Sequence, residues 1–331
     1  MKKLNLTLTA LTIILALTTS CKKHPMGGGV GQTNNAKEFA ATFGAQKQSI
    51  QIDASALPKT INLAGGTKIT FPVGSLTKGG VAVTGTVTVE AYEMLKRSSV
   101  ILSGSNTNHI SGAPLVSDGF IFVDVKSGGV SVDRNLAVPI DISIPAKRNG
   151  VTNLWEGVAA NNGAPLVAGD NAQMAWQAPK PANGQGGGVR EVNSVNNNFT
   201  FNFGTLGWIN CDVFYNNPNP KTTVTVQITN NPGTFASFMG FNGETFVFFC
   251  AKGSNVAAQL YTLNGTIGVK SYDNMMPIGS EGKMIAFSIK DGKYYYAEQE
   301  ITIAAAHSVT LTFIETTEAA VQTAITNLDG Y

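Results

Sequence analysis

Charged residues are scarce in this chain of 331 residues, at 13% of the sequence. The formal net charge is +2, and no basic run exceeds two residues, as at Lys22–Lys23. Removing residues 1–20 would delete two of the 23 basic residues and none of the 21 acidic ones, leaving equal numbers. Nucleic-acid binding requires a clustered positive surface. The sequence therefore predicts no nucleic-acid partner.

Catalytic motifs are also lacking. The three histidines, His24, His109 and His307, belong to no His-Glu-x-x-His sequence, and no Gly-x-Ser-x-Gly sequence occurs, so serine and zinc hydrolase templates have no anchor residues. A carboxylate pair from Glu90, Glu93 or Asp118 would suit a glycosidase. Solvent-facing strand and turn positions explain these acids as well. We predict that the chain is not an enzyme and has no cofactor.

The N-terminus has the three parts of a secretory signal. Lys2 and Lys3 precede an apolar stretch, residues 4–17, which is interrupted by polar residues and ends in small residues before Cys21. A membrane span needs about 20 apolar residues, so this shorter stretch predicts a cleaved signal peptide over residues 1–20.

Leu17-Thr18-Thr19-Ser20-Cys21 resembles the lipobox of bacterial lipoproteins, although the leucine stands one position earlier than usual. Looser boxes of this kind are similar to those of Bacteroidota lipoproteins. The resemblance implies that Cys21 carries a diacylglycerol and a further acyl chain such as palmitate, which anchor the chain in the outer membrane. No acidic run follows Cys21, which favours a periplasm-facing protein. The cell surface, or ordinary secretion after cleavage near Ser20, remains an alternative.

Once Cys21 is lipidated, Cys211 and Cys250 are the remaining cysteines. An oxidising envelope compartment permits a disulfide between them, which would contribute about 4 kcal/mol in the chain-entropy treatment. Alternatively, each behaves as a small buried hydrophobic residue. Without a Cys-x-x-Cys spacing or adjacent histidines they predict no metal site.

Two glycine clusters predict irregular backbone. Residues 21–45 contain Gly27–Gly29 and Gly31 and few residues to bury, which predicts a flexible tether. This cluster lacks the strand, helix and Gly-Lys-Ser/Thr ending of a phosphate loop. Gly184 and residues 186–188 predict an interior loop.

Elsewhere the periodicity is that of strands. Residues 67–71, 81–92, 119–125 and 138–144 are rich in β-branched and aromatic residues. Asp291-Gly292 predicts a hairpin, and residues 245–251, apolar throughout, predict a central strand covered on both faces. The spacing of Val321, Ile325 and Leu328 predicts a short C-terminal helix. The fold class is therefore all-β, with two sandwiches at 46–147 and 222–331, an intervening β-rich region at 148–221, and this helix.

The segment 65–76, GGTKITFPVGSL, resembles the opening of ZU5-type domains, where a proline and a small-residue turn follow a glycine-led strand. The wider pattern is similar to a group of Bacteroidota lipoproteins and includes Ser103-Gly104, Thr107, residues 115–117 and residues 207–212. The resemblance implies a β-sandwich used for interaction, without a catalytic constellation.

Residues 207–212 are the densest cluster of chemically capable groups. Trp208 is able to stack on a sugar ring while Asn210 and Asp212 bind its hydroxyls. The alternative is a buried tryptophan in a seam between domains, with Asn210 and Asp212 bonded to turn backbone. Trp155 and Trp176 allow the same two interpretations.

These observations together predict a lipid-anchored cell-envelope protein that acts as a binding or adhesion module for a glycan or an envelope protein. A structural envelope component without a small-molecule ligand is the first alternative. A carbohydrate-active enzyme is the second, weakened by the missing motifs.

Overall fold

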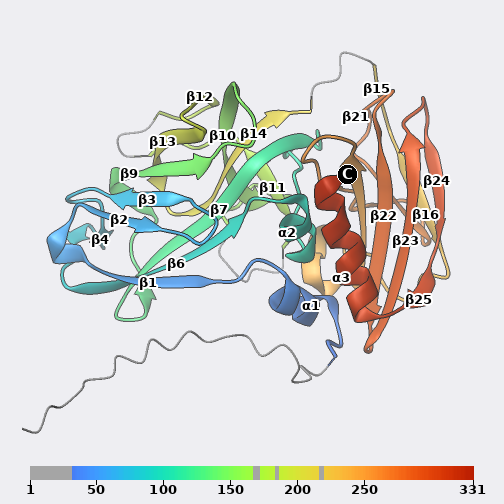
Figure 1. Ribbon diagram of the computed structural model, residues 1–331, viewed down its shortest axis with the longest axis horizontal. Coiled ribbons are helices and arrows are strands. Elements are labelled where there is room, and N and C mark those ends of the chain that lie inside the picture. The colour runs from blue at the N-terminus through green and yellow to red at the C-terminus, as the bar shows by residue number, and fades with distance from the viewer. Residues whose placement is uncertain (1–31, 167–171, 183–185, 216–219) are drawn as a thin grey trace, which may run out of the picture. The chain divides into compact units, whose positions relative to one another are not determined.

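The computed structural model describes residues 32–166, 172–182, 186–215 and 220–331 (Figure 1). Strands dominate this part of the chain, which confirms the all-β class. Thr33–Tyr331 form one compact unit. The predicted signal peptide and Cys21 lie outside the described residues.

The first sandwich is one long sheet that doubles back on itself. Its inward-facing side chains come from both halves of the sheet and form a single core, with β6 contributing Val87, Val89 and Ala91 at alternating positions, as the period of a strand requires. In spatial order the paired strands are β1 (Gln48–Asp53), β6 (Thr86–Met94), β7 (Leu115–Ser127), β14 (Gly207–Phe214), β10 (Val151–Ala159), β12 (Arg190–Val195), β13 (Asn198–Thr205), β9 (Asn135–Pro145), β3 (Lys68–Phe71) and β2 (Lys59–Asn62), with β11 (Met174–Gln177) on β10, β8 (Val130–Ser131) on β7, and a separate hairpin β4 (Thr77–Lys78) to β5 (Val81–Ala82).

The predicted boundary at residue 147 differs from this topology. β14 pairs with both β7 and β10, and β13 pairs with β9. The strands assigned to an intervening region at 148–221 therefore complete the first sandwich. The domain boundary depends on pairing between strands that are far apart in the sequence, and local periodicity does not predict such pairing.

The second sandwich packs two sheets around another core. One sheet has the order β19 (Thr262–Leu263), β20 (Gly268–Lys270), β16 (Thr225–Thr229) and β24 (Ser308–Thr312), and the other has β18 (Ala258–Gln259), β17 (Thr245–Ala251), β22 (Glu281–Lys290), β23 (Lys293–Thr302) and β25 (Ile314–Thr316), while β15 (Lys221–Thr222) pairs with β21 (Met276–Pro277). Asp291 and Gly292 both have positive φ and connect β22 to β23, as the hairpin prediction requires. Every residue of β17 is buried, which confirms its central position.

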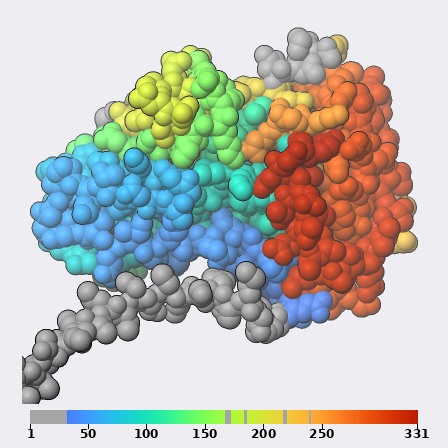
Figure 2. All heavy atoms as spheres, viewed as in Figure 1, coloured from blue at the N-terminus to red at the C-terminus, as the bar shows by residue number. Residues whose placement is uncertain are grey.

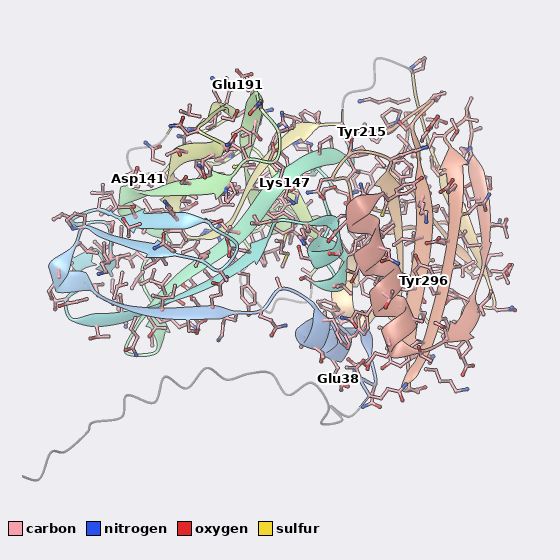
Figure 3. The ribbon with its side chains drawn as sticks, viewed as in Figure 1. Glu38, Asp141, Lys147, Glu191, Tyr215 and Tyr296 are labelled. Atoms are coloured by element: carbon pink, nitrogen blue, oxygen red, sulfur yellow. The ribbon has the colours of Figure 1, made fainter. Side chains whose placement is uncertain are left out.

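Helix α1 (Ala36–Phe43) corrects the predicted extent of the flexible tether. Asn35 caps the helix by accepting a hydrogen bond from the Glu38 backbone N–H at 2.9 Å, and the Glu38 carboxylate accepts bonds from Asn34 and Asn35. Glu38 is labelled on this helix in Figure 3. Phe39 is buried in the core. The Asn-x-x-Glu capping pattern and an apolar helix face therefore fold residues 36–43, which the glycine-rich composition nearby had obscured.

The predicted C-terminal helix is present as α3 (Glu318–Asn327). Thr317 caps it by accepting a bond from the Ala320 N–H at 3.2 Å, and Val321 and Ile325 face the core. The helix lies on the side of the second sandwich seen in Figure 2, beside β23 and its Tyr296 (Figure 3). The remaining helical segments are α2 (Arg97–Leu102) and the short turns η1 (Ala54–Ala56), η2 (Ser237–Asn242) and η3 (Leu328–Gly330). None of the described helices has the length and apolar character needed to span a membrane.

A third core fills the seam between the sandwiches. It joins the three tryptophans of the first sandwich to aromatic residues of β17 and β22. Polar contacts cross the same seam. The buried Arg97 guanidinium of α2 donates to the carbonyls of Ala251 at 2.7 Å and Leu328 at 3.1 Å, and also to that of Ser254. The two sandwiches are therefore held together by both packing and hydrogen bonds.

The start of the compact unit is fixed to the second sandwich. The Glu318 carboxylate accepts hydrogen bonds from the Thr33 backbone N–H at 3.0 Å and hydroxyl at 2.7 Å. The Tyr294 hydroxyl also donates to this carboxylate, at 2.9 Å. Thr33 is itself buried.

Candidate functional site: a cavity beside Trp208

The predicted site residues Trp208, Asn210 and Asp212 lie on one face of β14. Ile209 and Cys211, which alternate with them along the strand, lie on the other face. Asn210 and Asp212 have no exposed surface, and Trp208 is only 8% exposed. Amide and carboxylate groups that solvent does not reach cannot bind sugar hydroxyls. The placement fits the alternative of a tryptophan buried at the seam, although Asn210 and Asp212 lie in a strand and not in a turn.

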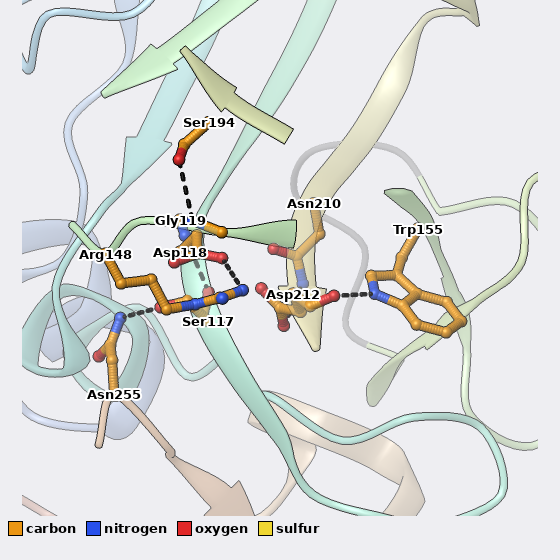
Figure 4. Close-up of polar contacts among 10 residues, drawn as sticks. Ser117, Asp118, Gly119, Arg148, Trp155, Ser194, Asn210, Asp212 and Asn255 are labelled. Carbon is orange, nitrogen blue, oxygen red and sulfur yellow. Dashed lines mark hydrogen bonds and ion pairs between the residues drawn. The ribbon is translucent and has the colours of Figure 1, made fainter. Parts of the chain in front are cut away.

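Asp212 is held in a dry, hydrogen-bonded environment (Figure 4). Asn210 Nδ2 donates to Asp212 Oδ2 at 2.6 Å, and Trp155 Nε1 donates to the Asp212 backbone carbonyl at 3.0 Å. Burial raises the pKa of the Asp212 carboxyl well above its ordinary value. The side chain is therefore predisposed to the neutral form, which lowers the cost of its burial.

The three carboxylates considered for an acid–base pair, those of Glu90, Glu93 and Asp118, are each engaged in ion pairs or hydrogen bonds. Glu90 forms ion pairs with Lys126 at 2.8 Å and Lys47 at 3.1 Å. Glu93 accepts bonds from backbone N–H groups of the loop at 65–67, and it lies on the opposite face of β6 from Glu90. Asp118 pairs with Arg148 at 2.6 Å. Burial raises the pKa of Asp118, with Arg148 acting against this shift. Glu90 and Glu93, on opposite faces of β6, therefore do not form an acid–base pair, and Asp118 is engaged by Arg148.

Cys211 and Cys250 are free and fully buried. Cys211 faces the core of the first sandwich and Cys250 the core at the seam. The disulfide alternative is therefore wrong for this structure, and the small-hydrophobic alternative holds. Burial raises the pKa of the Cys250 thiol to about 12, so it stays protonated.

The other metal-binding side chains do not converge. His109 packs against Trp155 with ring centroids 5.2 Å apart, and burial lowers its pKa. His307 accepts a backbone bond from Ala304 at 3.1 Å. Across the described ranges, no group of three or more His, Cys, Asp or Glu side chains is placed to hold a metal ion.

A cavity of about 330 Å³ opens beside Trp208. The indole of Trp208 is stacked with Tyr92 at a centroid distance of 6.4 Å and an interplanar angle of 27°. Met94 and Met174 line the cavity from β6 and β11, helix α1 contributes Ala40 and Ala41, and η2 of the second sandwich contributes Phe241. The cavity is thus built at the seam from segments that are far apart in sequence.

Gly104 shapes one wall of the cavity. Its φ is +62°, and a Cβ atom at this position would lie 2.3 Å from the Phe241 ring. Glycine is therefore required both by the backbone conformation and by the close approach of the ring. The Ser103-Gly104 pair noted in the sequence gains a physical role here, which its local pattern did not reveal.

Charge at this cavity is confined to two lysines. Lys47 is engaged by Glu90, whereas Lys37 on α1 is exposed and forms no hydrogen bond or ion pair within the described part of the chain. Gln46 Nε2 is bonded to backbone carbonyls, and the Ser103 hydroxyl donates to Ser99 and accepts from Ala45. An apolar interior beside one unpaired cation suits binding of an amphipathic molecule.

Comparison with protein-family models and with curated protein sequences finds no match to this chain.

Proposed function

We propose that this chain is a lipid-anchored binding protein of the cell envelope, held in the outer membrane through Cys21 and facing the periplasm. Its ligand is a small molecule with an apolar body and a negatively charged end. The cavity beside Trp208 carries this proposal, because its volume of about 330 Å³ lies within the range of small-molecule sites.

The apolar walls supply most of the binding free energy in this proposal. An apolar body of about 200 Å², the size of a large aromatic side chain, gains about 5 kcal/mol on burial at about 25 cal/mol per Å². An exposed ion pair with Lys37 adds at most about 1 kcal/mol. The lysine therefore orients the ligand, whereas Trp208, Tyr92 and the methionines retain it.

A glycan fits this cavity less well than an amphiphile. Sugar hydroxyls need unpaired polar groups, and here the Gln46 amide nitrogen and the Ser103 hydroxyl are already hydrogen-bonded. Asn210 and Asp212 are buried away from the cavity lining. A protein without a small-molecule ligand, which acts only in envelope structure, is the competing outcome that the experiment below distinguishes.

The test uses the full chain with Cys21→Ser, which removes the acylation site. Sodium decanoate, decanol and glucose are titrated by calorimetry. We expect decanoate to bind, decanol to bind up to about fivefold more weakly, in line with the loss of one exposed ion pair, and glucose not to bind. Lys37→Gln should remove the difference between decanoate and decanol.

A cavity-filling variant locates the site. Ala40→Leu on α1 should abolish decanoate binding. Ala324→Leu on α3, which lines a different cavity, is the matched control and should bind as before. Absence of decanoate binding, or equal binding by Ala40→Leu and Ala324→Leu, would contradict the proposal and favour the structural alternative.

A further inference from the structure

Arg134 is an unpaired cation at a second cavity. It precedes β9, is half-buried, and its guanidinium forms no hydrogen bond or ion pair with any described residue. Burial lowers the pKa of Arg134, while the nearby Glu156 acts against this shift. Because a guanidinium stays charged in proteins and offers five donors, an unpaired one facing a cavity is a ready site for a carboxylate.

The Arg134 guanidinium lies beside Gly207. A Cβ atom on Gly207 would lie 3.4 Å from each of Cζ, Nη1 and Nη2. These equal distances show that the flat face of the guanidinium is turned toward the glycine. The φ of Gly207 is +124°, so the backbone also favours glycine at this position.

The Glu156 side chain lies on the face of the β10–β14 pair that Arg134 covers at Gly207. It pairs across the sheet with Ile209, which is two residues from Gly207 along β14. Residues two apart along a strand, such as Gly207 and Ile209, point to the same face and are about 7 Å apart. Within the described residues no ion pair joins Arg134 to Glu156, although Glu156 is near enough to act on the pKa of Arg134. A gap therefore separates the positive group from the negative one.

Glu156 is 3% exposed, and only one of its oxygens is occupied within the described residues. Gln177 Nε2 donates to Oε1 at 2.7 Å. Oε2 accepts no hydrogen bond from the described part of the chain and is free to accept one from a ligand. A buried carboxylate with a free oxygen favours a cationic donor more strongly than a hydroxyl.

Arg134 and Glu156 line a cavity of about 720 Å³, together with Asp133, Lys180 and Thr205. The Asp133 carboxylate is already satisfied by the Thr77 hydroxyl at 2.7 Å and by two backbone N–H groups, at 2.8 and 2.9 Å. The lining carries two basic and two acidic side chains. A purely anionic ligand would meet two carboxylates, and a purely cationic one would meet two cations. A ligand with one positive and one negative group avoids both kinds of charge repulsion.

We propose that this cavity binds a small zwitterion of the α-amino carboxylate class. Its carboxylate lies on the donor edge of Arg134, and its ammonium group donates to Oε2 of Glu156. The site shares no lining residue with the cavity beside Trp208, so it stands independently of the function proposed above.

The probes are L-alanine, N-acetyl-L-alanine, which lacks the ammonium charge, and L-alanine amide, which lacks the carboxylate. They are titrated by calorimetry into the full chain carrying Cys21→Ser. We expect L-alanine to bind and each analogue to bind at least tenfold more weakly. Equal binding of L-alanine and either analogue, or no binding of L-alanine, would overturn the proposal.

Two variants assign the ends of the ligand. Arg134→Gln and Glu156→Gln should each weaken L-alanine binding at least tenfold. Arg190→Gln is the matched control, because Arg190 is bonded to Asn202 on β13 and does not line the cavity. Thermal unfolding confirms that each variant is folded. A folded Arg134→Gln variant that binds L-alanine as well as Arg190→Gln does would also overturn the proposal.

Discussion

The buried Asp212 carboxyl predicts a specific pH dependence of stability, which Asp212→Asn should remove. The amide is similar in shape and keeps an oxygen that accepts the bond from Asn210. In the folded state burial raises the pKa of Asp212 above its ordinary value of 3.8. Between 3.8 and the raised value, the folded protein retains a proton that the unfolded chain has released. The stabilisation by this group is therefore complete below pH 3.8 and is lost as the pH rises through the folded-state pKa.

The magnitude follows from one proton per molecule. In that window the free energy of unfolding contributed by Asp212 falls by about 1.4 kcal/mol for each pH unit. Asp118 also has a raised pKa, but it is present in both proteins and largely cancels from their difference. The free energy of unfolding of Asp212→Asn, relative to that of the unsubstituted chain, should therefore rise by about this amount per pH unit from pH 4.5 until the folded-state pKa of Asp212 is reached, and stay level above it.

Urea denaturation followed by tryptophan fluorescence, at half-unit steps from pH 4.5 to 7.5, measures this difference. Asp133→Asn is the control, since hydrogen bonds lower the pKa of that partly exposed carboxyl and keep its titration below the tested range. If the stability curves of the unsubstituted chain and Asp212→Asn run parallel over the whole range, the carboxylate is ionised in the fold and the reasoning is refuted.

Three further predictions concern other parts of the fold. Arg97→Met leaves buried carbonyls at the seam without their donor, and should lower the free energy of unfolding by about 3 kcal/mol in urea denaturation, whereas an unchanged midpoint would contradict the role of these bonds. Cys211 and Cys250 are free and buried, so they should not react with Ellman's reagent in native Cys21→Ser protein. After unfolding in guanidinium without reductant, both should react, giving two thiols per molecule. Reaction in the native protein, or fewer than two thiols after unfolding, would count against this prediction. Asn35→Ala removes the cap of α1, at a cost of about 1 kcal/mol, and should reduce hydrogen-exchange protection in α1 before any other helix; uniform loss would indicate that α1 does not open separately.

Local patterns in the sequence predicted local structure well. The hairpin at Asp291-Gly292, the central strand at 245–251 and the helix containing Val321 and Ile325 each depend on neighbouring residues, and all three are present. The start of α1 was also encoded locally, in the Asn35-x-x-Glu38 pattern, but the prediction of a tether up to residue 45 overlooked it.

The long-range strand pairing and the two cavities could not be predicted from the sequence. The placement of β10 and β14 in the first sandwich depends on strands about 90 residues apart in the chain, such as β7 and β14. The burial of Trp208 was one of two alternatives, because a tryptophan suits both a core and a sugar site. The cavity beside it draws on six separate segments of the chain. The site at Arg134 and Glu156 was missed because neither residue stands in a recognisable motif.

In the acylated protein proposed above, the hydrogen bonds between Thr33 and Glu318 would limit how far the folded unit moves from the bilayer. If Cys21 is acylated as proposed, 12 residues connect the anchor to Thr33, and a fully extended chain of that length spans about 40 Å. A tether running to residue 45 would have allowed twice this distance. Helix α1 follows Thr33 directly and carries Lys37 at the mouth of the cavity beside Trp208. In the anchored state proposed for this chain, the cavity that Lys37 lines would therefore stay within short reach of the lipid headgroups.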